Sequence, residues 1–98
     1  MTSSALDMRI PAALSANISD QTLSVELSDG RSLSAPLTWF PRLLHATPGE
    51  RSNWKLVGKG DGIRWDDLDE DISIESLLLG RASKESPASL ARWLKKRG

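Results

Sequence analysis

The dipeptide Asp29-Gly30 separates two segments in which apolar and polar residues alternate. The alternating apolar residues are Leu23, Val25 and Leu27 before the dipeptide, and Leu33 and Ala35 after it. Alternation with a period of two is typical of a half-buried β-strand. Glycine, and to a lesser degree aspartate, tolerates the positive φ angles of a type I′ turn, so the dipeptide favours a hairpin. The sequence therefore predicts two antiparallel strands joined by a tight turn.

The residues before this hairpin show the same alternation. Leu14, Ala16 and Ile18 alternate with polar residues, and this pattern predicts a third strand whose apolar side chains point into the core. We therefore expect a three-stranded antiparallel meander over residues 13–35. A second hairpin is predicted further along, because an extended segment at 54–58 and a returning segment at 63–65 flank a turn rich in glycine.

Capping residues predict short helices between the strands. Thr38 can cap a first helix after Pro36, where the preceding strand ends. Thr47 and Glu50 have the spacing of a capping box, and Pro48 between them suits the first helical position.

Two further helices are predicted toward the C-terminus. Ser73 is expected to cap one that runs to Leu79 and stops at Gly80. Ser86-Pro87 begins the last helix. That helix has Leu90, Ala91, Trp93 and Leu94 on one face and ends in Lys95, Lys96 and Arg97.

These elements predict an α+β fold: a small antiparallel sheet built from two hairpins and a meander, with short helices and a C-terminal amphipathic helix. Ninety-eight residues suit one domain. We divide the chain into a flexible lead-in (1–12), a core domain (13–80), and a linker with a basic C-terminal helix (81–98). No apolar run approaches the roughly 20 residues of a membrane span, and the absence of cysteine fits a reducing compartment. We therefore expect a cytoplasmic protein.

Charge is distributed unevenly, although the net charge is zero. Residues 61–75 contain seven acids and one base, Arg64, whereas residues 81–98 contain six bases and one acid, Glu85. Such asymmetry can serve a partner, or the two segments can face each other.

The acidic stretch from Trp65 to Ser73 is the first candidate for chemistry. With Asp67 as the first position of a calcium loop, Ile72 stands where glycine is needed and Leu78 where glutamate is needed. The spacing also does not single out a pair of carboxylates for acid–base catalysis. We therefore interpret the stretch as a solvated loop that leads into a helix, with partner recognition as the alternative.

Other catalytic patterns are weak. His45 is the single histidine, and no nucleophile motif of the Gly-x-Ser-x-Gly type occurs. Four tryptophans could stack nucleic-acid bases, but packing in the core or across strands is the favoured interpretation. For Arg51 and the hairpin from Trp54 to Trp65 we expect a role in stability.

Several segments together resemble the bacterial domain-of-unknown-function family 2442. The segments are LSDGRSLSAPLTWFPRL and ATPGERSNWKLVGKGDGIRWDDLDEDISIESLL. The resemblance implies a small α+β domain with no known catalytic activity. It also implies an association with toxin–antitoxin genes, often beside a second small protein. No helix-turn-helix motif follows residue 86, where only one further helix fits.

We accordingly expect a non-enzymatic protein-interaction domain, the antitoxin-like or regulatory partner in a bacterial two-protein module. Its expected partner is a small protein encoded nearby, with self-association left open and no membrane contact. A nucleic-acid accessory role of the basic C-terminal helix is the alternative. We predict no catalytic, cofactor-binding or metal-binding residue. The candidate interaction residues are Trp39, Arg42, Arg51, Asp66, Asp67, Arg92, Trp93, Lys95, Lys96 and Arg97.

Overall fold

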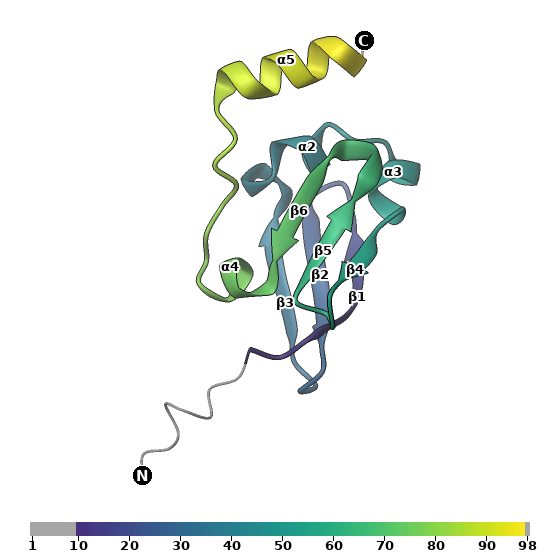
Figure 1. Cartoon of the computed structure of the whole chain (residues 1–98), viewed down its shortest axis with the longest axis vertical. Helices are drawn as coiled ribbons and strands as arrows, with labels where there is room; N and C mark the ends of the chain where they lie inside the picture. Colours follow the sequence, from purple (N-terminus) through teal and green to yellow (C-terminus); the bar gives the residue numbers. More distant parts are fainter. Residues whose placement is uncertain (1–9, 98) are drawn as a thin grey trace.

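Two three-stranded antiparallel sheets form the body of the protein, and short helices cover its ends (Figure 1). The computed structural model describes residues 10–97, so residues 1–9 of the predicted lead-in and Gly98 lie outside the described residues. The first sheet has the order β1-β2-β3 and consists of β1 (Ala13–Ile18), β2 (Thr22–Leu27) and β3 (Ser32–Pro36). The predicted meander and the α+β class are confirmed.

The turn between β2 and β3 differs from the predicted type I′ turn. Gly30 has a φ of 92°, but the φ of Asp29 is not positive. Within residues 10–97, Asp69 is the only non-glycine residue with a positive φ. The amide of Gly30 donates to the carbonyl of Leu27 at 3.1 Å, and the amide of Leu27 donates to Arg31 at 2.8 Å. This is the three-residue hairpin in which a type I turn precedes one left-handed glycine.

A bulge in β1 overturns the predicted inward orientation of Leu14. Ala13 pairs with Leu27, whereas Ser15 pairs with Glu26, so Leu14 is the extra residue of the strand. The bulge shifts the alternation only at the start of the strand, because Ala16 and Ile18 pack against the core as predicted. As a result Ala13 is buried and Leu14 is 58% exposed.

Three short helical segments connect the two sheets: the 3₁₀ turn η1 (Leu37–Trp39), α2 (Pro41–Leu44) and α3 (Pro48–Ser52). The prediction that Thr38 caps a helix is wrong. Thr38 lies inside η1. The amide of Leu37 donates to the carbonyl of Gln21 at 2.9 Å, and the turn begins at Leu37, one residue before Thr38.

The capping box of α3 is confirmed. The hydroxyl of Thr47 accepts the amide of Glu50 at 3.1 Å, and the carboxylate of Glu50 accepts the amide of Thr47 at 2.9 Å. Pro48 occupies the first turn, where backbone amides have no partner within the helix, so the missing N–H of proline costs no hydrogen bond. The box fixes α3 at the end of the sheets that α2 also covers.

The second sheet has the order β4-β5-β6, with β4 (Lys55–Val57), β5 (Gly62–Trp65) and β6 (Glu70–Ser73). The predicted hairpin is confirmed as β4 and β5. The solvated-loop interpretation of the acidic stretch is wrong for the backbone, because the 3₁₀ turn η2 (Asp66–Leu68) reverses the chain at Asp69, whose φ is 51°. The chain then returns as β6, which pairs Ile72 with Ile63 and so buries an apolar side chain.

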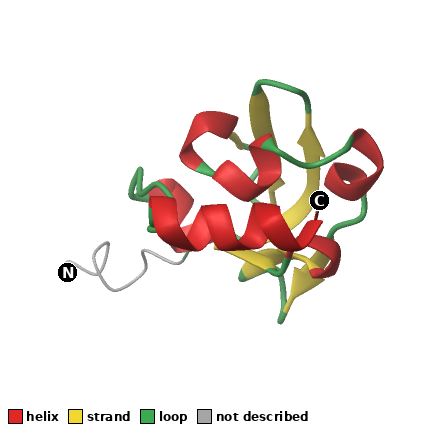
Figure 2. Ribbon diagram, turned by 90° about the horizontal axis from the view of Figure 1, so that it is seen from above, coloured by secondary structure: helices red, strands yellow, loops and turns green. Residues whose placement is uncertain are grey.

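The last two helices begin and end as predicted. Ser73 caps α4 (Ile74–Leu78) by accepting the amide of Ser76, and Gly80, with a φ of 71°, ends it. The hydroxyl of Ser86 accepts the amide of Ser89 at the start of α5 (Pro87–Arg97). Figure 2 shows α5 lying across the end of the sheets near α2 and α3. No helix within residues 10–97 is long and apolar enough to cross a membrane.

Trp65 is the largest fully buried side chain of the core. Its indole N–H donates to the carbonyl of Arg51 at 2.9 Å. The rest of the apolar core consists of aliphatic residues of both sheets and of the short helical segments, together with Phe40. The tryptophan packing predicted from sequence is confirmed for Trp65, and Trp39, Trp54 and Trp93 pack against the core while only partly buried.

Gly60 brings the two sheets into direct contact. Its carbonyl accepts the amide of Ala13 at 2.8 Å. A Cβ at this position would lie 2.7 Å from the Ala13 carbonyl oxygen and 2.8 Å from the Ala12 Cβ. The turn after β4 therefore needs glycine for the close approach of β1 as well as for its positive φ.

We predict that Trp65→Ala lowers the melting temperature strongly. Loss of a buried tryptophan costs about 3–5 kcal/mol, and this variant also removes the indole N–H that donates to the Arg51 carbonyl. Asp67→Ala, two residues away and exposed, is the matched control and should melt close to the parent. Thermal unfolding followed by circular dichroism measures both. Equal melting temperatures for the two variants would contradict the assignment of Trp65 to the core.

We predict that Gly60→Ala destabilises the fold more than Gly30→Ala. The two glycines have nearly equal φ angles of 93° and 92°, so both variants carry similar backbone strain. Only at Gly60 would the new methyl group meet backbone atoms of β1, whereas nothing lies within 4 Å at Gly30. Overpacking typically costs about 1–3 kcal/mol, and urea unfolding should show a difference of that size. Equal losses of stability in the two variants would contradict the prediction, because β1 would then move away from the new methyl group at no cost in free energy.

Candidate functional site

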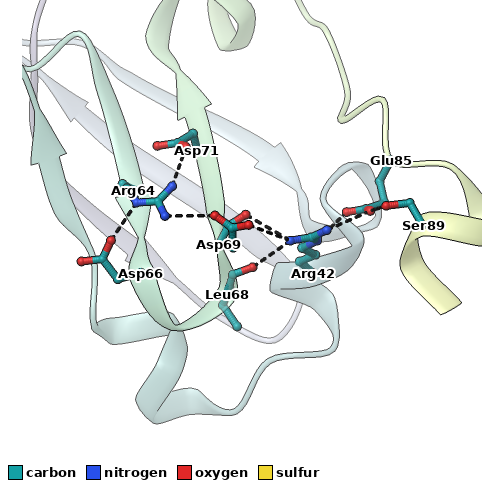
Figure 3. A network of polar contacts seen from close by, with 8 residues as sticks. All are labelled: Arg42, Arg64, Asp66, Leu68, Asp69, Asp71, Glu85 and Ser89. Atoms are coloured by element: carbon teal, nitrogen blue, oxygen red, sulfur yellow. Dashed lines mark hydrogen bonds and ion pairs between the residues drawn. The ribbon is translucent and has the colours of Figure 1, made fainter. Parts of the chain in front are cut away.

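Two groups of charged side chains lie next to each other at the end of the molecule that α5 covers (Figure 3). One surrounds Arg64 on the outer face of the second sheet. The other surrounds Arg42 on α2 and joins the core to the linker before α5. Of the ten predicted interaction residues, these two groups contain Asp66 and Arg42.

Arg64 holds three of the five acids of the acidic stretch. Its Nε donates to Asp66 at 2.7 Å, its Nη2 to Asp69 at 3.0 Å and its Nη1 to Asp71 at 2.6 Å. Arg64 and Asp71 are cross-strand partners, and η2 brings the other two acids back toward the same guanidinium. The hydrogen bonds that Arg64 donates to these carboxylates, the one to Asp69 foremost, raise the pKa of Arg64.

The two predicted interaction residues of this stretch have partners within the chain. Asp66 also pairs with Lys55 at 2.9 Å, and its pKa is lowered by hydrogen bonds from Lys55 and then Arg64. Asp67 accepts a hydrogen bond from the side-chain amide of Asn53 at 2.9 Å. Both side chains remain exposed. Within residues 10–97 no group of three or more acids, histidines or cysteines is arranged to hold a metal ion.

Arg42 joins α2 to the end of η2 and to the linker before α5. Its Nη1 donates to the carbonyls of Leu68 and Asp69, each at 3.1 Å, and its Nε and Nη2 donate to Glu85 at 2.6 and 3.2 Å. Only 16% of the Arg42 side chain and 7% of the Glu85 side chain are exposed. The hydrogen bond from Arg42 lowers the pKa of Glu85, and the same bond raises the pKa of Arg42.

Trp93 and Arg97 attach α5 to the same end of the core. The guanidinium carbon of Arg42 lies 5.3 Å from the centroid of the Trp93 ring, and that of Arg97 lies 4.6 Å from it. Both distances are within the range of cation–π attraction. Arg97 also donates to the two carboxylate oxygens of Glu50 at 2.7 and 2.9 Å. These bonds, followed by that from the Thr47 amide, lower the pKa of Glu50 to about 2.

Glu70 is the acid of the stretch that points away from the Arg64 cluster. It pairs with Trp65 across the strands and therefore shares the inner face of the sheet. Burial raises its pKa to about 7, and the nearby Arg42 opposes that rise. Glu70 lines a groove beside β6 together with Phe40, Ser76 and Lys84.

The predicted site residues thus divide by role. Arg51 is buried and donates to the carbonyls of Leu43 and Leu44, both at 2.9 Å, at the end of α2. Trp39 is half-buried, and its carbonyl accepts the amide of Ser83 at 2.9 Å. The basic residues of α5 that are exposed and have no ion pair within residues 10–97 are Arg92, Lys95 and Lys96.

Sequence reasoning missed Glu50, Arg64, Glu70 and Glu85 as members of the site. Of these, Glu85 carried a signal, since it is the single acid in a basic segment and so a partner for a cation elsewhere. Within residues 10–97 no ion pair joins the acidic segment to the basic segment, so their ion pairs do not support the suggestion that the two face each other. The basic residue Arg97 pairs with Glu50, outside the acidic segment, whereas Arg64 lies within that segment and neutralises it.

Comparison with known proteins identifies relatives without an assigned function. A family model described as "protein of unknown function (DUF2442)" matches residues 15–83. No curated protein matches the sequence. A crystal structure of a protein of unknown function from Rhodospirillum rubrum is 25% identical, with a TM-score of 0.67 over 84% of this chain and 99% of that chain. A solution NMR structure of the uncharacterized protein CV0863 from Chromobacterium violaceum is 21% identical, with a TM-score of 0.67 over 96% of this chain and 83% of that one.

We predict that Glu70 makes stability decrease as the pH rises from about 5 to 8. Its pKa is about 7 in the folded protein against a usual 4.5, so the folded state binds the proton more tightly than the unfolded state. The stabilisation is complete below about pH 4.5 and is lost as the pH passes through about 7. After allowance for solvent screening it amounts to on the order of 1 kcal/mol.

Melting temperatures of the parent and of Glu70→Gln across this pH range test the assignment. The parent should lose stability with rising pH, and the variant should lose less because its side chain cannot ionise. Glu75→Gln, an exposed acid on α4, is the matched control and should follow the parent. Parallel curves for all three proteins would show that Glu70 is not the group responsible.

Proposed function

The chain belongs to the DUF2442 family of proteins of unknown function, and we propose that it is a non-enzymatic protein-interaction domain. In this proposal it is the regulatory or antitoxin-like partner in a bacterial two-protein module and works in the cytoplasm. The partner is a small protein encoded nearby. The observation that carries the proposal is the attachment of α5, a helix with no buried residue that presents a basic surface to solvent.

The way in which α5 is held supports an interaction role. Its contacts with the core are made by side chains, with Trp93 between two guanidinium groups and an ion pair from Arg97 to Glu50. The other side of the helix carries Arg92, Lys95 and Lys96, all exposed. Charges on a surface of this kind steer association and select partners. The proposed partner therefore presents an acidic surface.

The state of the ion-paired carboxylates supports a non-enzymatic role. Glu70, whose pKa is raised to about 7 by burial, gives no such support. Acid–base catalysis needs a carboxylate that is free to exchange a proton with a substrate. Asp66, Asp69 and Asp71 are instead bound to Arg64, and Glu85 is bound to Arg42. These ion pairs hold the surface in one arrangement, which suits recognition.

Nucleic-acid binding by the basic surface of α5 is the second candidate. The exposed cations Arg92, Lys95 and Lys96 are sufficient by themselves to contact phosphate groups. Base stacking is less well supported, because Trp65 is buried and Trp39, Trp54 and Trp93 pack against the core.

Co-purification with the product of the adjacent gene tests the proposed function. The affinity-tagged full-length chain should recover that protein, and recovery at low salt should fall for Lys95→Glu. Lys59→Glu makes the same charge change in the exposed turn after β4 and should recover the partner as the parent does. Recovery of this chain alone at every salt concentration would refute the proposal. Binding to nucleic acid that weakens linearly with the logarithm of salt concentration would establish the alternative.

A further inference from the structure

The surface under α5 contains one cation and one anion that the core itself holds in place. Arg42 is fixed by the carbonyls of Leu68 and Asp69, both of them outside α5. Glu50 is fixed by the capping box, in which its carboxylate accepts the amide of Thr47. The two charges therefore keep their positions whether or not α5 is present.

The segment from Glu85 to the end of α5 supplies an opposite charge for each of these two side chains. Glu85 pairs with Arg42, and Arg97 pairs with Glu50. Trp93 lies one helical turn before Arg97 and packs its ring against both guanidinium groups. The 11 residues of α5 span about 16 Å, and the acid, the aromatic ring and the arginine together form a pattern that a partner helix can reproduce.

The covering helix is separable from the family core. The family model ends at residue 83, before α5 begins at Pro87. None of the residues of α5 is buried, and its two ion pairs lie near its two ends. The Arg97–Glu50 pair is partly exposed and contributes little. The Arg42–Glu85 pair is largely buried, so a competing helix must supply an acid of its own to Arg42.

We propose that the surface formed by Arg42 and Glu50 on α2 and α3 is a docking site for a helix of the partner protein, and that α5 occupies it within the same chain. The partner helix carries an aromatic residue, an arginine one turn later and an acid about two turns before the aromatic residue. This inference rests on the proposed function and specifies where the partner binds. It makes α5 an intramolecular competitor.

The tether explains why the occupant is a partner and not a second copy of this chain. A short linker gives α5 an effective concentration in the millimolar range at its own site. The α5 of another copy offers the same contacts without that advantage and is outcompeted at ordinary protein concentrations. A partner helix displaces α5 because the rest of the partner adds contacts, for example with the exposed bases of the displaced helix.

The test uses full-length protein and a fluorescent peptide with the sequence of residues 84–98. In the Trp93→Ala protein the tethered helix is weakened, so fluorescence anisotropy should show peptide binding at least about 10-fold tighter than in the parent. The Arg97→Glu peptide should bind the Trp93→Ala protein much more weakly. Adding Glu50→Arg to that protein should reverse the preference of the two peptides. Glu75→Arg, which makes the same charge change on α4, should leave the preference unchanged.

The outcomes separate this inference from the proposed function. No peptide binding to a folded Trp93→Ala protein, as judged by circular dichroism, would overturn the docking site. A preference that Glu50→Arg does not reverse would also overturn it. A dimer of the parent in size-exclusion chromatography that Trp93→Ala dissolves would show that a second copy is the occupant and would refute the partner assignment. Peptide binding with the predicted preference, but no protein partner from the cell, would uphold the site while refuting the proposed function.

Discussion

The arrangement of the end of the molecule that α5 covers depends on the hydrogen bonds of the buried guanidinium of Arg51. Helix α2 has only four residues, and a helix of that length is not stable alone in water. Arg51 binds the carbonyls of Leu43 and Leu44 at the end of α2, where the last carbonyls of a helix need partners from outside the helix. Its own carbonyl accepts the indole of Trp65. One residue of α3 therefore fixes α2 and attaches both helices to the core.

The position of α2 in turn determines where α5 lies. Arg42 extends from α2 to the carbonyls of Leu68 and Asp69, and it binds Glu85 before α5 begins. The acidic stretch thus has a structural role that differs from metal binding or catalysis. Its backbone supplies carbonyls that fix Arg42, and its side chains are gathered by Arg64. A rigid core and a loosely attached basic helix follow from these contacts.

Local signals in the sequence predicted most elements, and long-range contacts account for the errors. The capping residues Thr47 and Ser73 act within a few residues of their own position, and both predictions are confirmed. The bulge at Leu14 arises from pairing with β2, and the strand β6 arises from pairing of Ile72 with Ile63. The docking of α5 through Arg97 and Glu50 joins residues 47 positions apart, a separation at which sequence spacing carries no information.

Native-state hydrogen exchange tests most directly whether α5 is a separable helix on a rigid core. An 11-residue helix has little stability once released, so its amides should exchange through local opening at a free energy well below that of global unfolding. The amides of β2, at the centre of the first sheet, should exchange only through global unfolding. Comparison of the amides of residues 91–95 with those of β2 gives the two free energies. Equal values would contradict the account, because α5 would then be an integral part of the folded core.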